Sequence, residues 1–485
     1  MKVLYLPKLP LDATPKLFLK VQLRFPYHIH YIIGMDKTQK ERYGFHQTAD
    51  DATEHESQNM TLRHDDSPLK ICIVSREYPL ETLWGGIGTF TLNLAHGLKN
   101  IGHEVDVVAF SQYQDSLSED NGIRIHRIVS PEMPFLKKTL WEYANVALSP
   151  FAYWYSKKIS VKIEELYKEQ LFDIIDFPEH IGEGFCTIRK NLYPTAVRLF
   201  TPLSLIGKLG MNKVTNNFDY YLIGLLEKAS IRSATAVNSP SDNLAGMVKQ
   251  NFKINREIEI IYNPIDTEKF SPTGGIHSSR AEPLRVVFAG RLEDRKGVHI
   301  LAQAIPKVLQ AVHNAQFDIL GHDCAGVFGY SSMKAYMISV LRDHGAADNV
   351  NFIDPISYDA LPGYYGNGDI SVVPSLYDNS PYTCLEAMSC GLPVIGTSAG
   401  GMPEYIDNGI NGIVIPPNDS DALACALIDL LSHHEKRQDF GKQARKKSLT
   451  DFKREIISGK MVTFYRKTIL HHKHGTRPQS FGDIA

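Results

Sequence analysis

Two carboxylates and two cations stand at positions where a chain can bind a polar ligand. Asp378 and Glu386 lie eight positions apart in the stretch 374–395, which reads PSLYDNSPYTCLEAMSCGLPVI. Arg291 and Lys296 directly follow an apolar run much earlier in the chain. Arginine can grip two anionic oxygens at once, and lysine acts as a compact point charge. We expect these four groups to bind an anionic or polyhydroxyl ligand.

The local elements place the two acids at the junction of a strand and a helix. The run 369–374 is apolar and predicts a buried parallel strand. Ser380 is the expected N-cap, and Pro381 the expected first residue, of a helix over 382–389. Such a helix start offers free N–H groups and the positive end of the helix dipole to a ligand.

Strands and helices alternate along most of the chain. The expected strands are 70–76, 105–110, 123–128, 172–175, 195–199, 234–237, 258–261, 284–290, 317–320, 350–353, 370–373, 394–395 and 413–415. This alternation predicts doubly wound α/β domains. The turn after the first strand carries Gly85 and Gly86, which let a backbone approach a ligand closely, although tight packing alone also explains such a turn.

With these motifs the chain resembles the retaining, group 1 (glycogen-synthase-like) glycosyltransferases of the GT-B architecture. The motifs that carry the resemblance are the run LEAMSCGLPVI at 385–395, the pattern GRL…KG at 290–297 and the pattern GGxxE at 400–404. The resemblance covers about 69–470 and is most specific over 284–406. It implies an α/β fold of two Rossmann-like doubly wound domains that face a central cleft.

The resemblance also implies a role for each candidate residue. Glu386 would hold the ribose of a nucleotide-sugar donor, and Asp378 the hydroxyls of its sugar. Arg291 and Lys296 would stabilise the charge on the departing nucleoside diphosphate. The other donor-binding candidates are Gly85, Gly86, Gly290, Asn379, Ser380, Pro381 and Tyr382. Because the cations are side chains, we expect no metal and no cofactor, and the nucleotide sugar is a substrate.

Two positions depart from the pattern of the family. Asp378 stands where Glu is usual, which keeps the charge and shortens the side chain by one methylene. Phe200 stands where His is common, so either His180 acts in its place or no His side chain is needed. Glu179 and Glu183 are further candidates on the acceptor side.

Each motif also has a purely structural interpretation. Glu386 could simply complement the helix dipole, and the charged run 293–296 could be a solvated loop. We expect the GGxxE motif to shape the sugar pocket and to pack beside Asp378. The sequence Asp419-Ser420-Asp421 has the DxD form of metal-dependent glycosyltransferases, but it precedes an apolar helical run, so we interpret it as a helix cap.

Composition narrows the class of protein. The 485 residues are 43% hydrophobic and 22% charged with a net charge of −2, which is typical of a globular protein and does not call for nucleic acid as a partner. Six scattered cysteines indicate reduced thiols. No run approaches the ~20 apolar residues of a membrane span. We therefore expect a cytoplasmic protein, with peripheral attachment to the inner face of the membrane as an option.

That option depends on the stretch 133–168, which combines aromatic residues with lysines. Such a helix can dock to an anionic membrane, but a buried helix pair with a solvated lysine edge explains it as well.

We predict that the chain divides into six parts, beginning with an extension that includes a disordered linker and ending with a frayed tail. The parts are the extension (1–68), the acceptor domain (69–266), the interdomain linker (267–283), the donor domain (284–446), a helix that crosses back to the acceptor domain (447–470) and the tail (471–485). The expected function is a retaining transfer of a sugar from a nucleotide-sugar donor to a hydroxyl of a glycan, a lipid-linked or a small-molecule acceptor. The alternatives are a sugar-nucleotide epimerase of similar fold and a non-catalytic glycan-binding protein.

Overall fold

The computed structural model describes residues 67–79, 81, 85–129, 148–208, 217–272 and 283–475, all within the unit Asp66–Ala485. The predicted extension up to residue 66, the middle of the predicted linker (273–282) and the end of the tail (476–485) lie outside these residues. So does the first part, 133–147, of the aromatic stretch.

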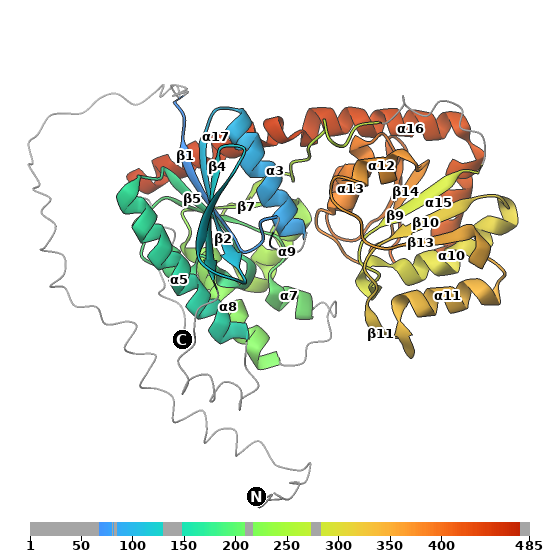
Figure 1. The fold of residues 1–485 in the computed structure, drawn as a ribbon, viewed down its shortest axis with the longest axis horizontal. Helices are drawn as coiled ribbons and strands as arrows, with labels where there is room; N and C mark the ends of the chain where they lie inside the picture. The colour runs from blue at the N-terminus through green and yellow to red at the C-terminus, as the bar shows by residue number, and fades with distance from the viewer. Residues whose placement is uncertain are drawn as a thin grey trace, which may run out of the picture. The chain divides into compact units, whose positions relative to one another are not determined.

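A mainly parallel sheet forms the first half of the described chain (Figure 1). Its order is β3-β4-β2-β1-β5-β6-β7-β8, and β3 with β4 is the antiparallel pair. The strands are β1 (Lys70–Ser75), β2 (Glu104–Ser111), β3 (Ser116–Asp120), β4 (Ile123–Val129), β5 (Ile174–Pro178), β6 (Thr195–Arg198), β7 (Ala236–Ser239) and β8 (Glu259–Ile260). β5 extends beyond its expected end at residue 175, because Asp176 and Phe177 continue the pairing with β6.

A second, wholly parallel sheet follows in the order β13-β10-β9-β14-β15-β16. Its strands are β9 (Arg285–Ala289), β10 (Gln316–Leu320), β13 (Val350–Ile353), β14 (Ile370–Val373), β15 (Val394–Thr397) and β16 (Gly412–Ile415). A short hairpin of β11 (Ala325–Val327) and β12 (Tyr330–Ser332) lies outside this sheet. The central strands β10, β14 and β15 are almost entirely buried, as expected for a parallel sheet with helices on both faces, whereas the edge strand β13 is partly exposed.

The helices of the first half lie between its strands. They are α3 (Gly86–Asn100), α5 (Leu148–Glu169), α6 (Phe185–Ile188), α7 (Leu203–Lys208), α8 (Asn217–Ser233) and α9 (Asp242–Phe252), with a short 3₁₀ turn, η3 (His180–Gly182), after β5. Those of the second half are α10 (Val298–Ala311), α11 (Met333–Asp343), α12 (Leu361–Gly366), α13 (Tyr382–Ser389), α14 (Met402–Tyr405), α15 (Ser420–Ser432) and α16 (His434–Lys447).

The last helix, α17 (Arg454–Lys473), returns to the first sheet and packs on α3 (Figure 1). Its Tyr465 Oη donates to Asp176 Oδ2 of β5 at 2.6 Å. One hydrophobic cluster includes Phe90 of α3, Leu385 of α13 and Met461 of α17. Apolar packing therefore joins the two halves.

The helix cap expected at Asp419 is confirmed, and the N-cap expected at Ser380 is wrong. Ser241 accepts from Leu244 N at the start of α9, and Asp419 accepts from Ala422 N at the start of α15, so Asp419 is a helix cap as interpreted. The N-cap of α13 is Pro381, not Ser380. The hydroxyl of Ser380 instead accepts from Asn263 Nδ2 at 2.7 Å and so is engaged by the first domain.

Candidate active site

Two loops meet where the order of the second sheet reverses. β9 pairs with β14, so the loops that follow these strands leave the same edge of the sheet side by side. In doubly wound sheets ligands bind outside the carboxyl ends of the strands at such a switch point. The loop after β9 carries Gly290, Arg291 and Lys296, and the loop after β14 carries Asp378.

Gly297 lets these two loops touch. Its φ of 69° is in the left-handed region, and a Cβ there would overlap the carbonyl oxygen of Pro374. Beside it, Leu376 N donates to Arg295 O at 2.8 Å. The glycine therefore brings the cationic loop against the acidic one.

The carboxylate of Asp378 pairs with two cations of the neighbouring loop. Lys296 Nζ lies 2.6 Å, and Arg295 Nη1 3.6 Å, from Asp378 Oδ2. Burial alone would raise the pKa of Asp378, but the charges of Lys296 and Arg295 and a hydrogen bond from the Ser380 amide outweigh it, so the pKa lies below its usual value. Asp378 therefore carries its charge at neutral pH.

The glycines of the GGxxE motif pack directly against the backbone of Asp378. Gly401 N donates to Asp378 O at 3.0 Å. Gly400 has a φ of 73°, and a Cβ there would overlap the backbone of Asp378. The motif thus packs beside Asp378 as expected. Its acid, Glu404, accepts from the amides of Asp242 and Asn243 at 2.9 and 3.1 Å and so caps α9 of the first domain.

Arg291 lies on the side of the site that faces the glycine turn. Its side chain is 61% exposed and its Nη2 is 3.2 Å from Glu293 Oε1. Burial raises the pKa of Glu77 in the first domain, and the hydrogen bond from the Gly88 amide, the charge of Arg76 and last the charge of Arg291 partly offset that rise. The Glu77 carboxylate accepts from Gly88 N at 3.2 Å, and a Cβ on Gly85 would overlap that carboxylate. Gly85 therefore lies beside Glu77, and Gly86, the first residue of α3, is exposed.

Glu386 is buried in the second turn of α13. Tyr365 Oη of α12 donates to Glu386 Oε2 at 2.9 Å. Burial raises the pKa of Glu386 to about 7, and the hydrogen bond from Tyr365 limits the rise. Within the described chain Glu386 forms no ion pair with Arg291 or Lys296. Glu386 belongs to the helix that follows β14, whereas the two cations belong to the loop that follows β9.

The residues between the two acids contact the first domain. Asn379 Nδ2 donates to Phe200 O at 3.1 Å and to the hydroxyl of Thr201. The amides of Asn379 and Tyr382 form no hydrogen bond with other described residues, whereas Pro381 has no N–H to offer. The amides left for a ligand are therefore those of Asn379 and Tyr382.

No hydrogen bond or ion pair among the described residues joins His180 to Lys296 or Asp378. His180 is half-buried in η3, and its side chain has no hydrogen bond with the described residues. Burial, and next the charge of Arg76, lower its pKa to about 4, which leaves it neutral near pH 7. Its catalytic role stays a prediction.

The two glutamates beside His180 anchor backbone amides. The carboxylate of Glu179 accepts from the amides of Phe200 and Thr201 at 2.8 to 2.9 Å, and Glu183 accepts from Arg76 N at 3.1 Å. Burial raises the pKa of Glu179 to about 7 and that of Glu183 to about 8. The ring of Phe200, at the position where His is common, packs edge-on against Phe90. Glu179 therefore holds the segment that Asn379 contacts.

Sequence reasoning missed Arg295 as a member of the site. It belongs to the charged run 293–296 that could have been a solvated loop, yet its side chain is 21% exposed and it contacts Glu293, Tyr377 O and Asp378. Its position next to Lys296 was the only signal in the sequence. The contact of Arg295 with Tyr377 O joins residues 82 positions apart, so no local sequence pattern predicts it.

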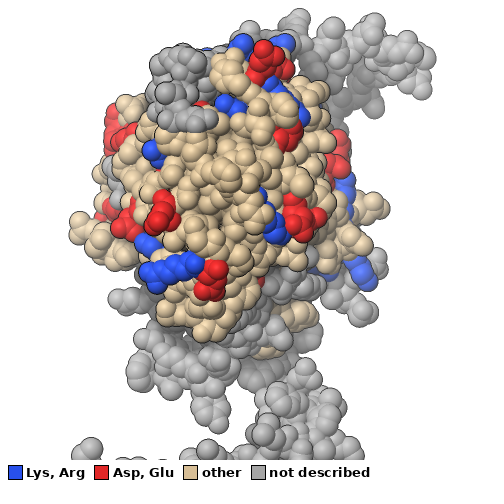
Figure 2. Space-filling model, turned by 90° about the vertical axis from the view of Figure 1, so that its right-hand side faces the viewer, with Lys and Arg blue, Asp and Glu red and all other residues tan. Residues whose placement is uncertain are grey.

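The charge on the surface of the second domain is mixed. On the face that Figure 2 shows, acidic and basic side chains are interspersed, and neither sign forms a continuous patch. None of the helices in the described part of the chain combines the length and apolarity that crossing a bilayer requires.

Known proteins share both halves of this architecture. Residues 275–447 match the family model described as "Glycosyl transferases group 1", and residues 84–269 match "Glycosyltransferase Family 4". An uncharacterized glycosyltransferase of Methanocaldococcus jannaschii is 26% identical over 417 residues, covering 82% of this chain and 98% of the relative.

Solved structures show the same fold. Sucrose-phosphate synthase from Thermosynechococcus elongatus aligns with a TM-score of 0.68 at 19% identity, over 83% of this chain and 99% of that one. HepE of Anabaena in complex with UDP aligns with a TM-score of 0.60 at 18% identity, over 82% of this chain and 100% of that one.

The fold and the paired loops at its switch point define a GT-B protein with two Rossmann-like doubly wound domains, as predicted. More narrowly, the chain belongs to the group 1 glycosyltransferases.

Proposed function

We propose that this glycosyltransferase moves a sugar from a nucleotide-sugar donor to an acceptor hydroxyl with retention of the anomeric configuration. The observation that carries the proposal is the convergence of Lys296 and Asp378, 82 positions apart, at 2.6 Å on the switch point of the second sheet. A cation and an acid at that edge suit a ligand with both phosphates and hydroxyls. The solved HepE complex with UDP, which has the same fold, supports a nucleoside diphosphate as the leaving group.

Each side chain then has a distinct task. Lys296 and Arg291 bind the diphosphate, which Gly290 and the turn at Gly85 and Gly86 approach by their backbones. Glu386, held by Tyr365, accepts from the ribose hydroxyls. Asp378 and the amides of Asn379 and Tyr382 bind the sugar hydroxyls.

The chemical step follows from retention. The acceptor oxygen forms a bond to the anomeric carbon on the face from which the diphosphate departs, and the bond from that carbon to the phosphate oxygen breaks. The acceptor proton moves to the leaving phosphate oxygen, so no separate base is required. The two cations stabilise the charge on the diphosphate, and the proposed reaction includes no metal and no cofactor.

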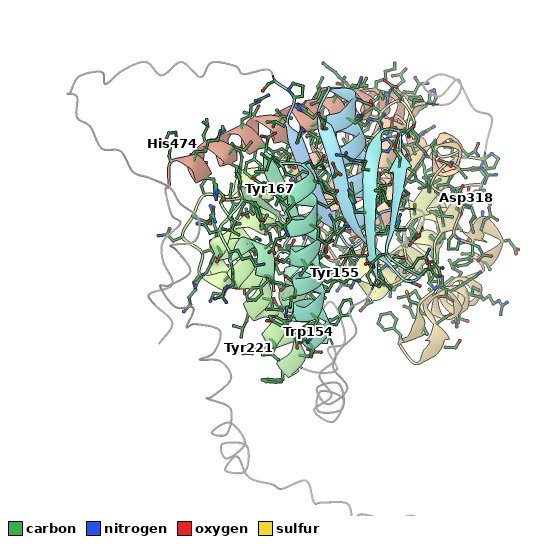
Figure 3. All side chains as sticks on the ribbon, turned by 60° about the vertical axis from the view of Figure 1, so that its left-hand side comes forward. Trp154, Tyr155, Tyr167, Tyr221, Asp318 and His474 are labelled. Atoms are coloured by element: carbon green, nitrogen blue, oxygen red, sulfur yellow. The ribbon has the colours of Figure 1, made fainter. Side chains whose placement is uncertain are left out.

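A lipid-linked acceptor is the case in which a membrane-facing surface would matter. Phe218, Tyr221 and Leu225 form an exposed stripe on α8, and Lys157 of α5 lies over the ring of Trp154. Figure 3 shows Trp154 and Tyr221 at the same end of these two neighbouring helices. An aromatic surface with a cation can bind at a lipid interface.

Co-sedimentation with vesicles tests this part of the proposal. Binding to anionic but not to neutral vesicles, weakened by the double substitution Phe218→Ser and Tyr221→Ser, is expected. Equal sedimentation with and without vesicles would leave a water-soluble acceptor as the substrate.

A donor screen tests the function itself. The purified protein is incubated with UDP-, ADP- and GDP-sugars, with and without simple sugar acceptors, and the products are separated by chromatography. Release of one nucleoside diphosphate and a product whose anomeric configuration matches the donor by NMR are expected. An inverted product contradicts retention, a donor isomer formed without acceptor indicates an epimerase, and the absence of nucleotide binding indicates a non-catalytic protein.

A further inference from the structure

The pair of Lys296 and Asp378 poses a problem for the proposed function. Lys296 is the compact cation of the site, yet its ammonium already binds the carboxylate of Asp378 at 2.6 Å. The side chains are only 18% and 14% exposed. A diphosphate that binds Lys296 must compete with Asp378 for the same charge.

Release of Lys296 would leave Asp378 without its nearest cation. A carboxylate largely withdrawn from water is strongly disfavoured unless another cation or several donors compensate it. The Ser380 amide is one such donor, but it is neutral. Donor binding would therefore be opposed unless a second cation took over.

Arg295 stands in the position to do so. Its Nη1 is 3.6 Å from Asp378 Oδ2 and 3.3 Å from Tyr377 O, while its Nη2 donates to Glu293 Oε1 at 2.9 Å. The backbone oxygen of Arg295 accepts from Leu376 N, which ties the residue to the same loop. A small rotation of a guanidinium already held at two points would bring Nη1 into hydrogen-bonding distance of Asp378.

We propose that Arg295 is a positioning residue that keeps Asp378 paired while Lys296 moves from Asp378 to the donor diphosphate. This inference rests on the proposed function. Glu293 takes part by holding both Arg295 and Arg291, whose Nη2 is 3.2 Å from the same Oε1. The five side chains Arg291, Glu293, Arg295, Lys296 and Asp378 carry three positive and two negative charges, so an anion enters a cluster with one positive charge to spare.

A double-mutant cycle read by calorimetry tests the exchange of partners. The dissociation constants of UDP, ADP and GDP are measured for the wild type, Arg295→Gln, Asp378→Asn and Arg295→Gln/Asp378→Asn. We expect Arg295→Gln to weaken the binding of the preferred nucleotide about tenfold. In the Asp378→Asn background the same change should alter the dissociation constant less than about threefold, because no charge remains to be paired.

The outcomes separate this inference from the proposed function. Equal effects of Arg295→Gln in the two backgrounds would overturn the role of Arg295 and leave the glycosyltransferase proposal intact. No nucleotide binding by the wild type would overturn both. Arg295→Lys keeps the charge and should restore most of the affinity, whereas a role in folding alone predicts that all Arg295 variants lose thermal stability together and that Asp378→Asn rescues none of them.

Discussion

The substitution Lys296→Ala removes the cation that the proposed reaction depends on most. Loss of one preorganised charge or donor from a developing oxyanion costs about 2.7–4 kcal/mol of transition-state stabilisation, or roughly 10²–10³ in kcat. The structure adds a second effect, because Asp378 keeps only Arg295 at 3.6 Å. Leaving a largely buried acid with a weaker partner costs about 1–3 kcal/mol of the free energy of unfolding.

The assay is release of nucleoside diphosphate with the preferred donor and acceptor at saturation, together with urea unfolding. Lys307→Ala is the matched control, because Lys307 is a half-exposed lysine of the same domain that pairs with Asp421 at 2.5 Å and lies outside the site. We expect kcat of Lys296→Ala to fall at least a hundredfold and that of Lys307→Ala to stay near the wild type. A kcat of Lys296→Ala within tenfold of the wild type would refute the leaving-group role.

Three further predictions concern the residues around this pair. Burial raises the pKa of Glu386 to about 7, so the unfolded chain releases this proton at lower pH than the folded chain does, and the free energy of unfolding falls as pH rises from about 4.5 to 7. Glu386→Gln should reduce this fall by up to about 3 kcal/mol, measured by urea unfolding at pH 5 and pH 8. An unchanged pH dependence in the variant would contradict the buried position of Glu386. Gly400→Ala should raise the KM for the donor and lower the free energy of unfolding by more than about 1 kcal/mol, because Gly400 has a left-handed φ and a Cβ there would overlap the backbone of Asp378. The control Gly246→Ala in α9, where nothing lies within 4 Å of the added Cβ, should stabilise the protein by up to about 1 kcal/mol. Equal effects of the two substitutions would contradict the close packing at Gly400. Glu179→Gln should lower the free energy of unfolding, measured by chemical denaturation, by about 1–3 kcal/mol, because the new NH₂ group would face the N–H groups of Phe200 and Thr201. Unchanged stability would show that the hydrogen bonds from these two amides to Glu179 contribute nothing.

Several elements of the site were predictable because their signals are local. Apolar runs located β9 and β14, and the residue pattern gave the bounds 382–389 that α13 has. The caps at Ser241 and Asp419 follow from a side-chain oxygen that reaches an amide within the same helix turn. Such contacts lie within a few residues, so sequence pattern and structure agree on them.

Other features depended on partners far away in the chain. Ser380 has the residue type of an N-cap, but its hydroxyl binds Asn263, 117 positions earlier, and the N-cap position is taken by Pro381. Glu404 looked like part of a sugar pocket, yet it caps α9 over a separation of 162 positions. A side chain satisfied by a distant group is no longer available for its local role.

The amino-acid sequence alone determined which residue types stand at the ends of the strands, and with them the family and the candidate groups Arg291, Lys296, Asp378 and Glu386. The tertiary structure alone decided that β9 and β14 are neighbours, and therefore that Lys296 pairs with Asp378 and that Arg295 is the second cation beside this carboxylate. The physical reason is that strand order results from hydrophobic packing and hydrogen bonding summed over the whole sheet. No short segment of the sequence contains all of these interactions, so the contact between Lys296 and Asp378, 82 positions apart, is visible only in the folded chain.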